Sequence, residues 1–435
     1  MKSDETCRWL GVLVAAVCTW ALAGCGDRSD VQTVEKRQAD RSTLTDVQIV
    51  EMRQADNSTL TDLHYGTSQW LYPLAASREK LASEPTYKST HPIYYAAVYG
   101  DSPDNVFTLV IDESRGTGAG FDTLYVDANN DNRIAPETER LAFPMSTVRE
   151  EHPVPVTFHV TSGGRTAPYT AGFTAFQYSD DKGPQGIHAN LRNGSYYVGE
   201  AVIGGKTRKI AVADLNSNGL FNDPEVGGVF RGDRFFVDLY NNGYRDEKGR
   251  SGGGGLPYGE LMKIDGRWYR LVVRPDGGEV RISAATPLLG KVEAAPTVAS
   301  VRLYSKAQPC VLDFTGGAAE GLAGTYGVYS IRLEAKDAEG RTWQTSGAFP
   351  KDSRPQLTIL ANRTVPLKAG GPPLRLEPTV ARGENPETLM LGLSLKGSAG
   401  EIYHWYMEHP TEVRPGVEVR DASGRLLVSA SLSYG

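Results

Sequence analysis

The stretch Lys209-Ile-Ala-Val-Ala-Asp-Leu-Asn-Ser-Asn-Gly-Leu-Phe-Asn-Asp-Pro-Glu225 decides what kind of fold this chain can adopt. Its first six residues alternate in the manner of a half-buried β-strand. From Asp214 onward, oxygen-bearing side chains occupy positions 1, 3, 5, 9 and 12 of a twelve-residue loop, with Gly219 at position 6 and Phe221 at position 8. Because a strand leads directly into this loop, the sequence predicts a polar loop on a β scaffold rather than between two helices.

The spacing of this loop is that of an EF-hand-type calcium site. Calcium takes about six to eight hard oxygen ligands, and the expected ligands are side-chain oxygens and one backbone carbonyl. They are Asp214, Asn216, Asn218, Asn222 and Glu225 through their side chains and Leu220 through its carbonyl. Only two of these groups are charged, which predicts weak binding, with a dissociation constant of about 10⁻⁴–10⁻³ M. The alternative is a plain Asn-Gly turn without a metal.

A second loop follows the predicted strand Phe121–Val126 and has a similar beginning. Asp127, Asn129 and Asp131 occupy positions 1, 3 and 5, but the closing carboxylate is out of register, because Glu137 and Glu139 flank position 12. Asn132 stands where a Gly is expected, and Asn is the next best residue for a left-handed backbone. The candidate ligands of this second site are Asp127, Asn129, Asp131, Arg133, Glu137 and Glu139. The alternative is an Asn- and Asp-rich hairpin turn.

A third candidate site comprises Asp238, Asn242, Tyr244 and Asp246. The segments 121–133 and 232–244 resemble each other, since each is a strand that ends in Asp and enters an Asn-rich turn. No Glu stands at position 12 of the third loop, so two alternatives stay open. Asp233 and Asp238 complete the site that begins at Asp214, or the segment is an Asn-Gly hairpin.

The N-terminus has the features of an export signal. Lys2 and Arg8 precede an uncharged run from Trp9 to Ala23, which is shorter than the roughly 20 residues of a membrane-spanning helix. Leu22-Ala-Gly-Cys25 resembles the lipobox of bacterial lipoproteins. This resemblance implies removal of residues 1–24 and attachment of lipid to Cys25. Gly26 after the cysteine favours the outer over the inner membrane, also by resemblance. The alternative is an ordinary signal peptide with an incidental cysteine.

Charge and cysteine content restrict the partners. The chain contains 46 Lys and Arg against 52 Asp and Glu, a net charge of −6, which argues against nucleic acid as a partner. Of the four cysteines only Cys25 and Cys310 remain after removal of the signal, so acylation of Cys25 leaves no disulfide within one chain. We therefore expect Cys310 to be a buried structural thiol.

Residues 30–45 are nearly repeated by residues 46–61, with differences at Thr33/Ile49, Lys36/Met52 and Arg41/Asn57. The repeat is polar and too short for a solenoid. We interpret 25–64 as a lipidated tether, with transient helix around Val31–Ala39 and Val47–Ala55. An interaction motif is the alternative.

The folded sequence is expected to be mainly β, because Gly, Pro and Tyr are frequent and short strands alternate with turn residues. Residues 65–285 form a β-rich domain with the EF-hand-like loops. Residues 286–435 carry about seven short strands, whose rhythm predicts an Ig-like β-sandwich. The aromatic residues Tyr403, Trp405 and Tyr406 could contact glycans, although the core face of a strand is the preferred interpretation.

The chain resembles secreted bacterial lipoproteins with EF-hand-like calcium loops from an otherwise uncharacterised β-rich family, and this resemblance supplies no activity. Neither a nucleophile elbow nor a Walker loop occurs. The sequence favours a lipid-anchored envelope protein with Ca²⁺ as its cofactor, in a binding or structural role. Its expected partners are the membrane, through the lipid, and a glycan or envelope protein. A calcium-dependent, polysaccharide-active hydrolase of the cell surface is the alternative.

Overall fold

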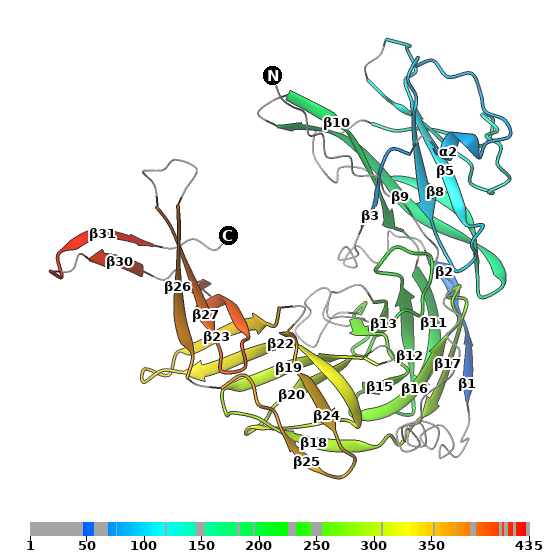
Figure 1. The fold of residues 1–435 in the computed structure, drawn as a ribbon. Coiled ribbons are helices and arrows are strands. Elements are labelled where there is room, and N and C mark those ends of the chain that lie inside the picture. Colours follow the sequence, from blue (N-terminus) through cyan, green and yellow to red (C-terminus); the bar gives the residue numbers. More distant parts are fainter. Residues whose placement is uncertain are drawn as a thin grey trace, which may run out of the picture. The chain divides into compact units, whose positions relative to one another are not determined.

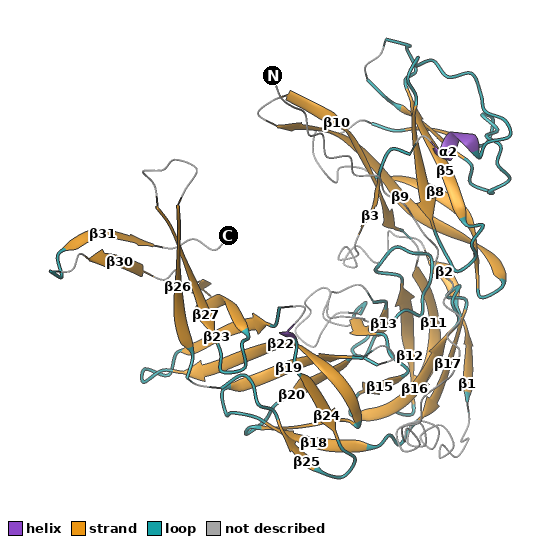
Figure 2. Cartoon of the chain, viewed as in Figure 1, coloured by secondary structure: helices purple, strands orange, loops and turns teal. Residues whose placement is uncertain are grey.

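The fold is that of a computed structural model, shown in Figures 1 and 2, and it is mainly β. The structure describes residues 47–55, 68–74, 76–117, 120–144, 153–180, 183–194, 196–224, 232–244, 255–305, 308–350, 353–371, 373–382, 389–408, 411–412, 416–420 and 423–431. Helix α2 spans Ala76–Glu79. In these segments no helix reaches the length and apolar character that crossing a membrane requires.

Four antiparallel sheets make up the first part of the fold. The first contains, in spatial order, β4 (Ile93–Val98), β5 (Val106–Asp112), β6 (Thr123–Val126) and β7 (Arg140–Ala142). The second contains β3 (Ser68–Leu71), β10 (Gly183–Asn193), β9 (Arg165–Asp180) and β8 (Val154–Ser162). The third contains β14 (Gly255–Pro257), β13 (Arg234–Val237), β12 (Lys206–Ala213), β11 (Tyr196–Ile203) and β2 (Arg53–Ala55). The fourth contains β1 (Gln48–Glu51), β17 (Glu279–Ala284), β16 (Arg267–Val273) and β15 (Leu261–Ile264).

One hydrophobic core connects these four sheets. Its fully buried side chains include Phe107 on β5, Phe173 on β9, Ile210 on β12 and Leu271 on β16. The strands alternate as their sequences predict: β8, for example, buries every second residue from Val156 to Ser162. The core thereby fixes the strand ends from which the Asp-headed loops emerge.

The later part of the chain forms three further sheets. The first orders β21 (Ala318–Leu322), β18 (Leu289–Glu293) and β25 (Thr364–Pro366), with β18 and β25 parallel. The second has nine strands along β20 (Cys310–Asp313), β19 (Val298–Tyr304), β22 (Gly324–Lys336), β23 (Thr342–Ala348), β28 (Ile402–Glu408), β27 (Leu389–Lys396) and β26 (Arg375–Arg382), with β24 (Gln356–Ile359) on β22 and β29 (Thr411–Glu412) on β28. The third pairs β30 (Gly416–Arg420) with β31 (Leu426–Ser431).

A second core lies beneath the three-stranded and nine-stranded sheets. Val292 of β18 and Leu322 of β21 belong to the same buried cluster as Val301 of β19 and Ile331 of β22. The prediction that Cys310 is a buried thiol is confirmed, and burial raises the pKa of this thiol to about 11. Tyr403 is also part of this core at 3% exposure, which excludes it from a surface contact.

The helix predicted around Val47–Ala55 is wrong. The second copy of the repeat forms β1, which pairs with β17, and β2, which pairs with β11, so it completes the edges of two sheets. Val50 and Met52 are buried and lie against Gly199, where an added Cβ would come within 2.8 Å of either side chain. Edge pairing and burial therefore override the helical propensity of this segment. The first copy lies outside the described residues, as do residues 1–24 and Cys25.

Candidate functional site

Three loops in the first part of the fold share one backbone pattern. Each begins with an Asp directly after a strand: Asp127 after β6, Asp214 after β12 and Asp238 after β13. In every case the carboxylate accepts hydrogen bonds from the amides four and five residues later. The residues three and five positions after each Asp have positive φ angles: Asn130 and Asn132, Ser217 and Gly219, and Asn241 and Gly243.

The loop at Asp214 turns its polar groups inward. Asp214 Oδ2 accepts bonds from the Gly219 amide at 2.7 Å and from the Tyr169 hydroxyl at 2.8 Å. Asn216 Oδ1 accepts a bond from the Asn218 amide at 3.2 Å, and Asn218 Oδ1 accepts one from the Leu220 amide at 2.9 Å. The first, third and fifth residues thus each use a side-chain oxygen to accept a backbone amide of the loop.

Turns from the other sheets converge on this loop. The Gly100 amide after β4 donates to the Asn218 carbonyl at 2.6 Å, and Ser162 Oγ at the end of β8 donates to the Gly219 carbonyl at 3.0 Å. The Phe221 amide donates to the Pro275 carbonyl between β16 and β17 at 2.9 Å. The loop is therefore a junction at which elements of all four sheets are tied together.

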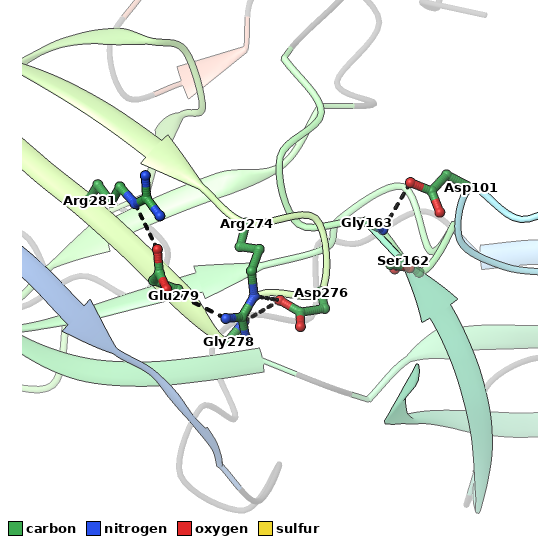
Figure 3. A network of polar contacts seen from close by, with 9 residues as sticks. Asp101, Ser162, Gly163, Arg274, Asp276, Gly278, Glu279 and Arg281 are labelled. Carbon is green, nitrogen blue, oxygen red and sulfur yellow. Dashed lines mark hydrogen bonds and ion pairs between the residues drawn. The ribbon is translucent and has the colours of Figure 1, made fainter. Parts of the chain in front are cut away.

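Figure 3 shows further polar contacts of the same turns. Asp101, beside Gly100, accepts a bond from the Gly163 amide at 2.9 Å, which joins the turn after β4 to the turn after β8. The turn after β16 is braced by an ion pair between Arg274 and Asp276 at 2.5 Å. These contacts hold the surrounding turns in place independently of the Asp214 loop itself.

The electrostatics of the junction are unusual, because its carboxylates are buried without a basic partner. Asp214 and Asp233 are both 0% exposed, and in the described part of the chain neither forms an ion pair with Lys or Arg. Burial raises the pKa of Asp214 to about 7. Burial, and then the charge of Asp214, raise the pKa of Asp233 well above its ordinary value. A bound cation would remove this desolvation cost.

A buried hydroxyl beside the loop also lacks a partner. Tyr99 is 0% exposed, and its hydroxyl makes no hydrogen bond with any described residue. Its ring packs against Tyr169, with centroids 4.7 Å apart, and Tyr169 donates directly to Asp214. Burial, followed by the nearby charge of Asp214, raises the pKa of Tyr99. An orphaned polar atom of this kind marks a place where a water or an ion belongs.

Asp233, which one open alternative assigned to this site together with Asp238, contacts the loop, whereas the described bonds of the Asp238 carboxylate lie within its own loop. The sequence prediction missed Asp223, Tyr99 and Tyr169 as neighbours of Asp214. Asp233 Oδ1 accepts a bond from the Leu215 amide at 3.3 Å, and its Oδ2 accepts one from the Asp223 amide at 2.7 Å, so Asp233 clamps both ends of the loop. Asp223 in turn accepts bonds from the side-chain amides of Asn216 and Asn218. Asp223 stands at position 10 of the loop, so its carboxylate could have been considered from the sequence. Tyr99 and Tyr169 are distant in the sequence, and no sequence pattern links them to the loop.

The structure describes two of the three remaining predicted ligands of the first site. Leu220 and Asn222 lie in the loop, half-buried, whereas Glu225 lies outside the described residues. In the described segments no three Asp, Glu, His or Cys side chains are grouped so as to hold a metal ion. Any cation at this loop would therefore depend on neutral amide and carbonyl oxygens in addition to the carboxylates.

In the second loop, the two candidate glutamates Glu137 and Glu139 differ in burial and in hydrogen bonding. Glu139 is 8% exposed and accepts bonds from the Ala128 amide at 3.1 Å and the Ala135 amide at 2.8 Å, whereas Glu137 is exposed. Asp127 is buried near Glu139, and burial raises the pKa of Asp127 to about 6. Asn129 and Asp131 accept bonds from amides two residues later, and Arg133 donates one of these. Glu139 is therefore the carboxylate that closes this loop.

The third loop is less complete. Asn242 and Gly243 donate their amides to Asp238, but Tyr240, at the third position, is 53% exposed. The Tyr244 hydroxyl donates to the Ile210 carbonyl at 3.3 Å, so this side chain is engaged elsewhere. Asp246 lies outside the described residues. The described part of this loop matches an Asn-Gly turn with a single buried carboxylate.

No protein-family model, curated protein or solved structure matches this chain.

Proposed function

We propose that the chain is a lipid-anchored protein of the cell envelope, in a binding or structural role, whose first β region is stabilised by calcium at the Asp214 loop. The observation that carries the proposal is the pair of fully buried carboxylates of Asp214 and Asp233, beside the Tyr99 hydroxyl. Among the described residues neither carboxylate has a basic partner, and that hydroxyl has no hydrogen-bond partner. The predicted ligands would hold the ion together with Asp223. They are Asp214, Asn216, Asn218, Leu220, Asn222 and Glu225. The contribution of the ion would be structural: it neutralises the buried charge and tightens the junction.

Several features support this proposal over a plain turn. An Asn-Gly turn needs no buried acid, whereas this loop buries Asp214 completely and receives Asp233 from a different segment. The positive φ angles and the shared Asp-to-amide bonds give the loop at Asp127 the same entry conformation. We propose that second loop, closed by Glu139, as a weaker site, and the loop at Asp238 as the weakest.

Two further parts of the proposal concern the rest of the chain. Lipid attachment at Cys25 and location at the outer membrane are supported by the sequence pattern at residues 22–26. An Ig-like arrangement of residues 286–435 is supported by the common core of the three-stranded and nine-stranded sheets. The hydrolase alternative gains nothing from Asp214 and Asp233, because a general acid must touch its substrate and both groups are fully buried.

Calcium-dependent melting tests the proposal. The full chain is melted in chelator and in 10 mM calcium, alongside the Asp214→Asn variant and a magnesium control. We expect calcium to raise the melting temperature of the unaltered chain by several degrees, since about 1.4 kcal/mol is gained at ten times the dissociation constant. The variant should show no calcium response. Identical melting of the unaltered chain with and without calcium would refute the calcium site.

A further inference from the structure

The sixteen-residue repeat near the N-terminus is a feature that the calcium proposal does not use. Its second copy, residues 46–61, supplies β1 and β2, which pair with β17 and β11 (Figure 1). Its first copy, residues 30–45, lies outside the described residues and differs from the second copy at three positions only. Each contact of the second copy therefore has a counterpart residue in the first copy.

Most contacts of the second copy involve its backbone or side chains that the first copy shares. β1 pairs with β17 and β2 pairs with β11 through backbone groups, which every non-proline residue carries. The buried side chain of Val50 has its counterpart in Val34. The Gln48 side chain, which accepts a bond from the Val202 amide at 3.0 Å, has its counterpart in Gln32. The first copy can therefore make the same pairs at the same two edges.

The positions that differ between the copies have unequal effects. Ile49 is 60% exposed, so its counterpart Thr33 fits the same outward position. Met52, between β1 and β2, is 8% exposed, and its counterpart is Lys36. A lysine stem can follow apolar surface, but its ammonium group must reach water, which costs free energy at a buried position. The third differing pair lies outside the described residues. Lys36 therefore makes the first copy a weaker version of the same strands.

We propose that the two copies are alternative occupants of the same sheet edges in one chain, the second copy in the major state and the first copy in a minor state. A copy in the same chain competes at a high effective concentration, so a second molecule is not needed to supply it. The exchange lengthens the connection to β3 from residues 56–67 to residues 40–67. The entropy cost of closing a loop rises only slowly with its length, so this longer connection permits the exchange.

The exchange changes the length of chain that precedes the sheets. Pairing begins at Gln48 with the second copy and would begin at Gln32 with the first. The N-terminal segment is then sixteen residues shorter, which corresponds to up to about 50 Å of extended chain. With the proposed lipid anchor at Cys25, the minor state would hold the first β region closer to the membrane. That consequence rests on the proposed function, whereas the exchange itself requires neither lipid nor calcium.

Disulfide trapping in the full chain, under slow oxidation in chelator, tests the exchange. Ile49 lies opposite Arg281 of β17, so Ile49→Cys with Arg281→Cys traps the pairing that the structure shows. Thr33→Cys with Arg281→Cys traps the proposed alternative. Gln38→Cys with Arg281→Cys is the matched control, because Gln38 corresponds to Gln54, which pairs with β11 instead. Mass spectrometry of the linked peptides identifies each disulfide.

We expect the Thr33 disulfide to form within one chain, about tenfold more slowly than the Ile49 disulfide, because Lys36 weakens the first copy. Lys36→Met should remove most of that delay. The Gln38 disulfide should form more slowly still and should not respond to Lys36→Met. Equal rates for Thr33 and Gln38, as an unpaired tether would give, overturn the proposal. So do a Thr33 rate that Lys36→Met does not raise and disulfides that form only between chains.

Two deletions provide a second measurement that needs no cysteine. Removal of residues 46–61 or of residues 30–45 gives chains of equal length with the same junction to Asp62, which differ at three residues only. We expect the chain that retains the first copy to fold and to melt several degrees lower in chelator, and Lys36→Met to remove most of this difference. If that chain does not fold even with Lys36→Met, the first copy cannot replace the second and the proposal is overturned. Both measurements are independent of the calcium site, because they are made in chelator.

Discussion

The loops at Asp214 and Asp127 have the same backbone conformation but different surroundings. Both begin with a buried Asp whose carboxylate accepts the amides four and five residues later. The loop at Asp214 is also bonded by turns from other sheets, whereas the loop at Asp127 is closed by its own Glu139. The same local motif thus joins four sheets at Asp214. At Asp127 it is closed by its own glutamate and bonds to one other sheet through the His159 amide of β8, which donates to the Ala128 carbonyl at 2.9 Å.

This comparison predicts how strongly a cation bound at each loop would stabilise the fold. At Asp214 a cation would act on groups from several sheets, so its binding is coupled to the stability of the first β region. At Asp127 it would act on a loop whose described bonds reach one other sheet, through His159 of β8. Four experiments test this difference between the two loops.

The largest effect is expected from the glycine at position 6. Gly219 has φ +80°, and an added Cβ would lie 2.8 Å from the Gly100 amide nitrogen and 3.0 Å from Tyr99 Cβ. Gly219→Ala should lower the free energy of unfolding by about 2–5 kcal/mol, combining backbone strain and overpacking. The matched change Asn132→Ala, at φ 62°, should cost about 1–2 kcal/mol through strain alone. Urea denaturation in chelator measures both, and equal losses would contradict the distinction.

The next experiment separates the two loops by their calcium affinity. Asp214→Asn removes a charge from the junction and should abolish the tighter binding step, with its gain of about 1.4 kcal/mol at ten times the dissociation constant. Asp127→Asn should leave that step unchanged and remove only a weaker one. Isothermal titration with calcium gives the number of sites and their affinities. Loss of the tighter step in Asp127→Asn would reverse the order of the sites.

The pH dependence of stability follows from Asp214. Its pKa in the folded chain is about 7, against 3.8 without burial, so the metal-free folded state holds a proton that the unfolded state releases between these values. Stability in chelator should therefore fall as pH rises from 4 to 7, by up to about 1.4 kcal/mol per pH unit from this group. Saturating calcium should flatten this slope, because it favours the ionised form. Melting curves across this range test both statements, and a slope that Asp214→Asn does not reduce would count against the assignment.

The smallest effect concerns the two glutamates of the second loop. Glu139→Gln weakens two amide contacts in a buried position and should cost about 1 kcal/mol. Glu137→Gln changes an exposed side chain and should alter stability by less than about 0.5 kcal/mol. Parallel urea titrations compare them. A larger loss for Glu137→Gln would show that the other glutamate closes the loop.

The sequence alone was enough to predict the mainly β character, several strand positions and the three Asp-headed loops, but not the strands β8, β9, β10 and β11. These features are local: alternation with period two defines a strand, and Asn or Gly after an Asp fixes a turn through bonds over four or five residues. The strand predicted before Asp214 is β12, and the strand predicted as Phe121–Val126 contains β6.

The groups that surround Asp214 are brought together by the packing of distant strands. Tyr99 and Tyr169 are distant in sequence, and they meet this carboxylate because four sheets share one core. The strands formed by residues 48–55 depend in the same way on the open edges of β17 and β11. Local propensity could not reveal them, because their stability comes from partners more than a hundred residues away.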